Sequence, residues 1–248
     1  MDLSEGDPNL ETRHPWETAR VAAVGALLRR LRLQAPRVLD VGCGDGYLVR
    51  TLKDESGFGE VFAQDIAFTA ELMEQLQTPG VRFLRELGEE HLEVDLLLLL
   101  DVLEHVDDPV AFLQGLVGSQ LAARGNVLIT VPAFQRLFTA HDEALSHRRR
   151  YSRSEIASVA RSAGLEVFDS GYLFFSLLLP RALAALHERV VERSAANHGI
   201  GSWKGPPSLT RWVHRTLVLD NTLCLKAQAR GLRVPGLTAW LLCKKPSS

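Results

Sequence analysis

Three closely spaced glycines form the first group of residues whose pattern suggests chemistry. Gly42, Gly44 and Gly46 follow a short apolar run and precede a segment with helical character, and Cys43 lies between the first two. Glycines allow a tight turn and a close approach of the backbone to a ligand, at which the following helix N-terminus is directed. The spacing is Gly-x-Gly-x-Gly, not the Gly-x-Gly-x-x-Gly of dinucleotide enzymes. The turn therefore predicts a cofactor site whose ligand need not contain a pyrophosphate.

Two acidic residues accompany this turn. Asp40 stands two residues before Gly42, where its carboxylate can organise the turn and receive a cationic end of the ligand. Asp65 follows Gly46 by 19 residues, at the end of the second expected strand. An acid at that place in this topology accepts hydrogen bonds from both ribose hydroxyls. The pattern therefore indicates a ligand that contains adenosine.

Histidines and a tyrosine form a second group, after the fourth and fifth expected strands. His105 follows the fourth strand, and His141, His147 and Tyr151 lie in the connection after the fifth. His141, with Asp142 beside it, could act as an oriented base, and His147 as a second base or a ligand of the acceptor. Tyr151 could orient a substrate through its hydroxyl. We therefore predict His105, His141, His147 and Tyr151 as candidate catalytic residues.

Simpler interpretations of these residues stay open. His105 also fits a hydrogen-bonded histidine that stabilises its loop. The basic run from Arg148 to Arg150 also fits a solvated turn, which is the interpretation we favour for Arg148. Arg149 or Arg150 could instead clamp an acidic group.

The elements that position these residues alternate along the chain. A helix is expected from Pro15 to near Leu33, because apolar residues recur there at helical spacing. Ser152 and Glu155 predict a capping box for a later helix. Alternating strands and helices indicate an α/β fold with a parallel sheet covered on both faces. The expected strands are 37–41, 60–64, 81–84, 95–100, 126–131, 166–168 or somewhat beyond, and 237–242, and the helices between them are 47–53, 67–76, 109–122 and 154–162.

A leucine-rich segment, residues 176–233, interrupts the alternation before the last strand. It predicts two long helices, about 176–191 and 209–230, joined by a loop over 197–208 that is rich in Gly, Pro and Ser. We expect an N-terminal helical part (1–36), a core (37–175 and 234–248) and this insertion. The surplus of leucine favours a roof over an apolar acceptor, with a homodimer contact or peripheral contact with a membrane surface as alternatives.

Composition excludes several classes of protein. The chain has 248 residues, of which 46% are hydrophobic and 23% charged, as in ordinary globular proteins. A formal net charge of -2 gives no reason to expect a nucleic-acid partner. Three distant cysteines fit neither a disulfide framework nor a zinc-cysteine site, and no apolar run reaches the roughly 20 residues of a transmembrane span. We therefore expect a cytoplasmic protein without a transmembrane span.

The sequence resembles the class I S-adenosylmethionine-dependent methyltransferases. The resemblance rests on residues 38–46, Asp65 and the segment Asp-Val-Leu-Glu-His at 101–105, and it spans roughly residues 37–151. Residues 141–151 are similar to a subgroup of small-molecule methyltransferases with a His-Asp pair followed by His-x-Arg-Arg-Tyr; Ser146 stands where that subgroup often has glycine. The resemblance implies a Rossmann-like, doubly wound sheet of seven strands, the last antiparallel, with S-adenosylmethionine as the cofactor.

Roles for several residues follow from this resemblance alone. The three glycines would contact the methionine part of the cofactor, and Asp101 its methionine end. Asp65 would bind the ribose, and Ile66 would face the adenine. Glu86 or its neighbours would lie near the adenine edge, although this region lacks the family's usual Asp.

The spacing Asp101-x-x-Glu104-His105 also allows a divalent ion, as in some quinone-pathway O-methyltransferases that share an acid-x-x-Glu-His segment. No further ligand is evident from the spacing, so no metal site is predicted.

We therefore expect methyl transfer from S-adenosylmethionine to a small, apolar or lipid-like acceptor. The alternatives are a methyltransferase that acts on protein or RNA, and a non-catalytic scaffold that binds the cofactor.

Overall fold

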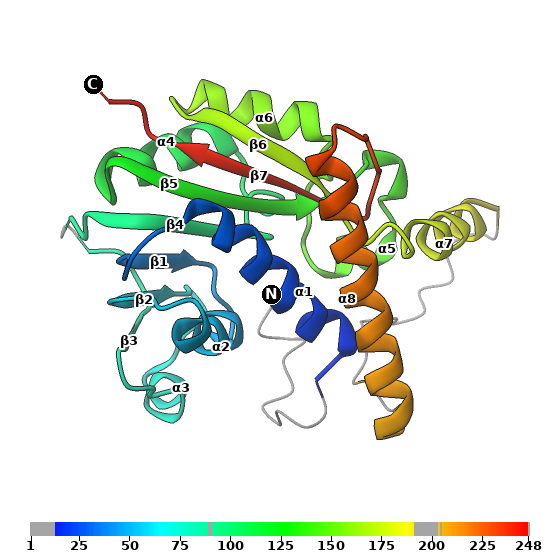
Figure 1. The fold of residues 1–248 in the computed structure, drawn as a ribbon, viewed down its shortest axis with the longest axis horizontal. Coiled ribbons are helices and arrows are strands. Elements are labelled where there is room, and N and C mark those ends of the chain that lie inside the picture. The colour runs from blue at the N-terminus through cyan, green and yellow to red at the C-terminus, as the bar shows by residue number, and fades with distance from the viewer. Residues whose placement is uncertain (1–12, 89–90, 191–202, 204, 248) are drawn as a thin grey trace.

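The sheet contains seven strands and has helices on both faces (Figure 1). The computed structural model describes residues 13–88, 91–190, 203 and 205–247. The strands are β1 (Val38–Val41), β2 (Val61–Gln64), β3 (Val81–Leu84), β4 (Val94–Leu100), β5 (Leu121–Pro132), β6 (Glu166–Leu173) and β7 (Thr238–Lys244). The helices are α1 (Pro15–Leu28), α2 (Tyr47–Glu55), α3 (Ala70–Gln75), α4 (Pro109–Ser119), α5 (Ala140–Ala144), α6 (Arg153–Ser162), α7 (Leu178–Val190) and α8 (Pro207–Ala229), with short 3-10 turns η3 (Arg29–Leu31) and η4 (Gln135–Leu137).

The strand order is β3-β2-β1-β4-β5-β7-β6. β1 pairs in parallel with both β2 and β4, and β7 runs antiparallel between β5 and β6. The order reverses at β1, so the carboxyl ends of β1 and β4 flank the crevice where ligands of open α/β sheets bind. The predicted Rossmann-like sheet of seven strands with an antiparallel last strand is confirmed.

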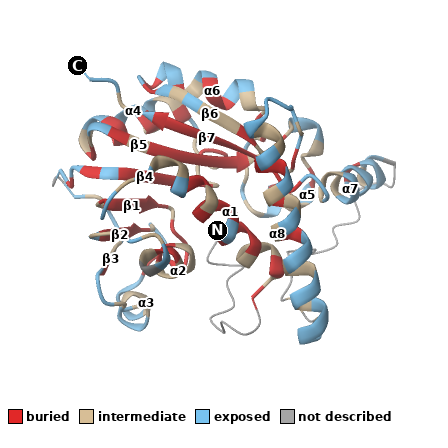
Figure 2. Ribbon diagram, viewed as in Figure 1, coloured by how far each residue is buried: buried red, intermediate tan, exposed pale blue. Residues whose placement is uncertain are grey.

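The central strands are buried on both faces, which explains their continuous apolar sequences (Figure 2). Successive leucines of β4 alternate between the two cores: Leu97 and Leu99 face one, and Leu96 and Leu98 face the other. The first core lies under α4 and α6, and the second under α1, α2 and α8. The sheet is therefore held rigidly between two helical layers, and its loops can carry a site.

Some predicted boundaries were wrong. α4 ends at Ser119 and not at 122, because Leu121 already pairs with Val94 at the start of β5. α3 begins at Ala70 and not at 67, because the Thr69 side chain caps it. β6 continues to Leu173, in agreement with the prediction that this strand extends somewhat beyond 168. The capping box at the start of α6 is confirmed.

The two predicted helices of the insertion are present between β6 and β7. α8 packs along α1 and also contacts β6, while α7 lies beside the η4–α5 segment (Figure 1). The expected loop at 197–208 lies mostly outside the described residues. Within the described part of the chain, no helix is long and apolar enough to cross a membrane.

Candidate active site

The glycine turn connects β1 to α2, and its backbone requires glycine. Gly42 and Gly46 both have a φ of 68°, a conformation that side chains disfavour. A Cβ atom on Gly42 would lie 2.8 Å from a methyl carbon of Val102, and one on Gly46 would lie 2.8 Å from the Phe83 ring. The turn is therefore packed from behind by the β4 connection and by β3, so it keeps a fixed shape toward solvent.

Asp65 holds the same turn from the end of β2. One of its carboxylate oxygens accepts a hydrogen bond from the backbone N–H of Gly44 at 2.9 Å, and the other accepts one from Ala67 at 3.0 Å. Ile66 beside it is 78% exposed, which is unusual for a large apolar side chain. The two residues thus offer an anchored carboxylate and an open apolar surface next to each other, which suits a ribose followed by a base.

A pocket opens between this turn and α1. Its wall combines the turn with the first part of α1: Glu17, Arg20, Val21, Asp40, Gly42, Cys43, Asp45, Tyr47, Leu48 and Leu100. Arg13 closes one side, because it pairs with Asp45 and Glu17 and stacks 3.8 Å from the centre of the Tyr47 ring. The sequence did not identify α1 as part of the site. A signal for it was the presence of the charged residues Glu17 and Arg20 in a largely apolar helix.

Asp40 is the most deeply buried acid of this pocket. It is 2% exposed, and its Oδ1 atom has no hydrogen-bond partner among the described residues. Burial raises the pKa of Asp40 to about 7. An unpaired buried carboxylate is costly, so a cation in the pocket would be stabilised there. This fits the cationic groups of S-adenosylmethionine.

Asp101 follows β4 at the edge of the same region. Its carboxylate pairs with Arg20 of α1 at 2.8 Å and accepts a hydrogen bond from the Thr130 hydroxyl at 3.0 Å. Burial alone would raise the pKa of Asp101, but the Arg20 guanidinium, the Thr130 hydrogen bond and the charge of His147 contribute to holding the pKa below its usual value. Asp101 therefore remains ionised and is fixed from two sides.

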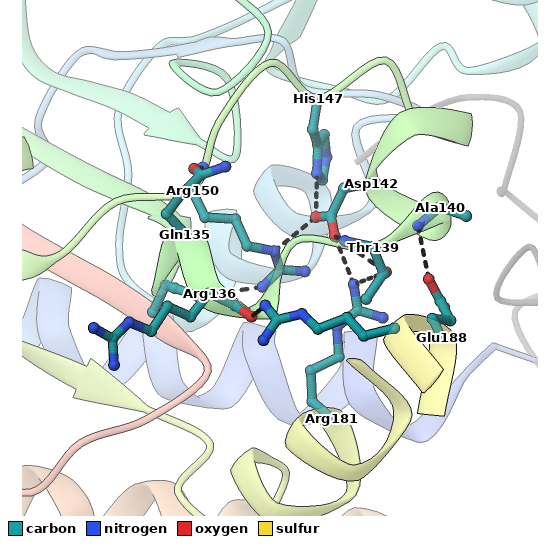
Figure 3. Close-up of polar contacts among 11 residues, drawn as sticks. Gln135, Arg136, Thr139, Ala140, Asp142, His147, Arg150, Arg181 and Glu188 are labelled. Atoms are coloured by element: carbon teal, nitrogen blue, oxygen red, sulfur yellow. Dashed lines mark hydrogen bonds and ion pairs between the residues drawn. The ribbon is translucent and has the colours of Figure 1, made fainter. Parts of the chain in front are cut away.

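The acceptor-side connection is organised around a second buried acid, Asp142 of α5 (Figure 3). Its Oδ1 accepts hydrogen bonds from His147 Nδ1 at 3.0 Å and Arg150 Nε at 2.7 Å. Its Oδ2 accepts one from Arg181 of α7 at 2.6 Å. Burial would raise the pKa of Asp142, but the hydrogen bond from His147 and the charge of Arg150 hold it well below its usual range.

Asp142 thus orients His147. The sequence suggested a His141–Asp142 pair because the two residues are adjacent, whereas in the structure Asp142 orients His147. Arg181 was not identified from the sequence. It belongs to the insertion, and the sequence signal for it was a charged residue among the leucines of α7.

Three ligand-type side chains gather beside Asp142. A carboxylate oxygen of Glu104 and one ring nitrogen each of His105 and His147 lie within 4.8 Å of one another. The two imidazole rings pack edge to face, with centroids 4.8 Å apart. Burial, and next the charge of Asp101, raise the pKa of Glu104 well above its usual value. The structure thus joins His105 and His147, and His141 lies outside this group.

The remaining acceptor-side residues face inward or pair locally. The buried Tyr151 donates its hydroxyl to the carbonyl of Leu103 at 3.0 Å, and burial raises the pKa of Tyr151 to about 12. Arg150 is buried against Asp142. Arg148 pairs with the exposed Asp107, as expected for a solvated turn. Catalytic roles for Tyr151 and His141 stay predictions.

Comparison with known proteins shows to which family the chain belongs. A family model described as a methyltransferase domain matches residues 16–170. The chain belongs to this methyltransferase family. The match includes α1, the glycine turn and the acceptor-side connection, so it covers the pocket and the Asp142 group together. No curated protein matches the sequence.

Solved structures agree on the fold of this methyltransferase. The 1,6-didemethyltoxoflavin-N1-methyltransferase of Burkholderia thailandensis, solved with its acceptor and S-adenosylhomocysteine, is 18% identical over 92% of this chain and 78% of its own, with a TM-score of 0.53. An S-adenosylmethionine-dependent methyltransferase of Mesorhizobium loti is 13% identical over 91% of this chain and 99% of its own, with a TM-score of 0.54. The [4+2]-cyclase SpnF, at 16% identity over 92% of this chain and 82% of its own, has a TM-score of 0.56.

The cyclase shows that the fold by itself does not fix the reaction. The family match and the fold together confirm the prediction of a methyltransferase that uses S-adenosylmethionine.

Proposed function

We propose that this methyltransferase transfers a methyl group to a small, apolar or lipid-like acceptor at the edge of the sheet between β4 and α5. The observation that carries the proposal is the continuity of the two polar groups. Asp101 contacts Arg20 in the cofactor pocket, and Glu104 and His105, a few residues further along the same connection, face His147. A reacting acceptor atom could therefore lie near both groups.

On the cofactor side, the chain supplies shape and charge. Bound S-adenosylmethionine provides an electrophilic methyl group on a sulfonium. Asp40 and Asp45 place negative charge in the pocket wall, and Arg13 and Arg20 place positive charge beside it. Asp65 and Ile66 would hold the ribose and the adenine face. These contacts would bind the cofactor and orient its methyl group, which is most of what an in-line displacement requires.

On the acceptor side, the group of Glu104, His105 and His147 handles the acceptor proton. Asp142 fixes the His147 ring through Nδ1, so the other ring nitrogen, Nε2, is directed away from that acid. Both imidazoles are partly exposed, whereas the neighbouring Glu104 is fully buried. The acceptor atom would thus approach from the imidazole side.

The insertion contributes the apolar character of the acceptor site. Three residues of α7 tie this helix to the acceptor connection: Arg181 to Asp142, Glu188 to the Ala140 N–H and Arg189 to the Arg136 carbonyl (Figure 3). The same helix leaves Leu179, Leu183 and Leu186 exposed. We propose that α7 roofs the acceptor and supplies apolar surface where the displacement must exclude water.

The experiment is incubation of the protein with methyl-labelled cofactor and fractionated cell extract, followed by identification of the labelled compound. The wild-type protein and His147→Gln are compared with His91→Gln, in which an exposed histidine near Ser119, at the other end of the sheet, is changed. The proposal expects label in small organic-soluble compounds, lost in His147→Gln and kept in His91→Gln. Label confined to protein or RNA would replace it with the macromolecular alternative.

A further inference from the structure

We propose that Glu104, His105 and His147 form a binding site for one divalent transition-metal ion, of the Zn²⁺ or Mn²⁺ type. Ligand atoms bound to a single ion at about 2.0–2.2 Å are at most about 4.4 Å apart. The three candidate ligand atoms already lie within 4.8 Å of one another. Small side-chain rotations would therefore complete the site without movement of the backbone.

Glu104 provides the observation that independently points to a ligand. It is 0% exposed, and among the described residues neither carboxylate oxygen has a hydrogen-bond partner outside its own residue. Buried carboxyl groups are normally hydrogen-bonded, paired with a cation or bound to a metal. The cations around this loop have other partners: Arg20 pairs with Asp101 and Arg150 with Asp142. Arg148 and Arg149 bind the carbonyls of His105 and Asp107. An ion between Glu104 and the imidazoles would satisfy the carboxylate.

His147 has the second interaction that metal-binding histidines have. Its Nδ1 donates to Asp142, which leaves Nε2 with a lone pair for an ion. A carboxylate behind a ligating imidazole fixes the ring and increases its basicity. Asp142 is held in turn by Arg150 at 2.7 Å and by Arg181 at 2.6 Å. The orientation of His147 is thus built into the fold.

The donor set decides the class of ion. Two imidazoles and one carboxylate suit Zn²⁺, Mn²⁺ or Fe²⁺, whereas Mg²⁺ and Ca²⁺ prefer oxygen ligands alone. Asp101 is not part of the set, because Arg20 and Thr130 occupy its carboxylate. The sequence spacing grouped Asp101 with Glu104 and His105, and the fold replaces it by His147. An ion held by three protein ligands keeps coordination positions open for an acceptor oxygen. An oxygen bound there would lose its proton more easily, so the three side chains would act on that proton through the ion. Only this catalytic role rests on the proposed function.

The test is a metal titration of the protein after removal of metal with a chelator. Calorimetry with Zn²⁺, Mn²⁺ and Mg²⁺ is expected to show one tight site for Zn²⁺ or Mn²⁺ and none for Mg²⁺. His147→Gln and Glu104→Gln are expected to weaken binding at least 10-fold. Asp107→Asn, which changes an exposed carboxylate in the same loop, is the matched control and keeps the wild-type affinity.

A second measurement does not depend on the folding of the variants. Co²⁺ added to the wild-type protein is expected to give a d–d absorption spectrum with nitrogen and oxygen ligands, at one ion per chain. Absence of a site with Kd below 100 μM, or unchanged affinity in folded His147→Gln, overturns the metal site. S-adenosylhomocysteine binding is measured on the same samples. A wild-type protein that binds S-adenosylhomocysteine but no metal ion overturns this inference and leaves the proposed function standing.

Discussion

The Arg20 guanidinium lies 2.8 Å from the Asp101 carboxylate and joins the first helix to the end of β4. The two side chains are 7% and 17% exposed, so this ion pair is largely removed from solvent. Arg20 lines the proposed cofactor pocket, and Asp101 follows Leu100, which also lines it. α1 is therefore part of the site, although it precedes the glycine turn.

Arg20→Met is expected to destabilise the protein by about 3–5 kcal/mol, because it leaves Asp101 charged and unpaired in a buried place. Arg37→Met is the matched control, since the Arg37–Glu60 pair is about 43% and 42% exposed and is worth roughly 0–1 kcal/mol. Urea unfolding measures both. Similar losses of stability in the two variants would show that the buried ion pair contributes no more than the exposed one.

Asp40 gives a pH dependence of stability. Its pKa is about 7 in the folded protein and about 3.9 in an unfolded chain, so the folded state holds the proton more tightly. The stability that Asp40 contributes is present in full below the unfolded pKa. It is lost as pH rises through the folded pKa of about 7. Between pH 5 and pH 8, the wild type should lose about 2.5 kcal/mol that Asp40→Asn does not lose. Parallel stability curves for the two proteins would contradict this.

Tyr151→Phe separates a structural role from a catalytic one. The hydroxyl donates to the buried Leu103 carbonyl, and its removal should cost about 1–3 kcal/mol of stability. Urea unfolding and methyl transfer are measured on the same sample, at a temperature where the variant is folded. Unchanged stability with lost turnover would instead favour the predicted orienting role.

Arg181 should determine how firmly α7 is held. Arg181→Met removes the ion pair with Asp142, so amide hydrogens of α7 are expected to exchange faster while those of β4 stay unchanged. His187→Gln, an exposed change on the same helix, serves as the control. Equal protection of α7 in all three proteins would show that other contacts hold the helix.

The sequence was informative where a few neighbouring residues determine the structure. The glycine turn needs positive φ angles within one loop, and Asp65 follows a strand at a distance that the topology fixes. The capping box of α6 is likewise contained in four residues. Such features require no knowledge of the tertiary packing.

The sequence was less informative about side-chain partners that depend on tertiary contacts. The Arg20–Asp101 pair depends on how α1 crosses the sheet, and α1 in turn packs on α8. Adjacent residues of a helix point about 100° apart, so Asp142 could not be assigned to His141 from their adjacency. Its contact with Arg181 comes from an insertion whose docking no local pattern encodes.

Cofactor binding tests the central claim most directly. Calorimetry with S-adenosylhomocysteine should show one site on the wild-type protein and none for NAD⁺. Asp65→Ala should weaken binding about 10-fold or more, because charged hydrogen bonds contribute about 1.5–3 kcal/mol. Glu60→Ala, which changes the acid at the opposite end of β2, should leave the affinity unchanged. Absence of binding in the wild type, or equal affinity in Asp65→Ala, would contradict the account.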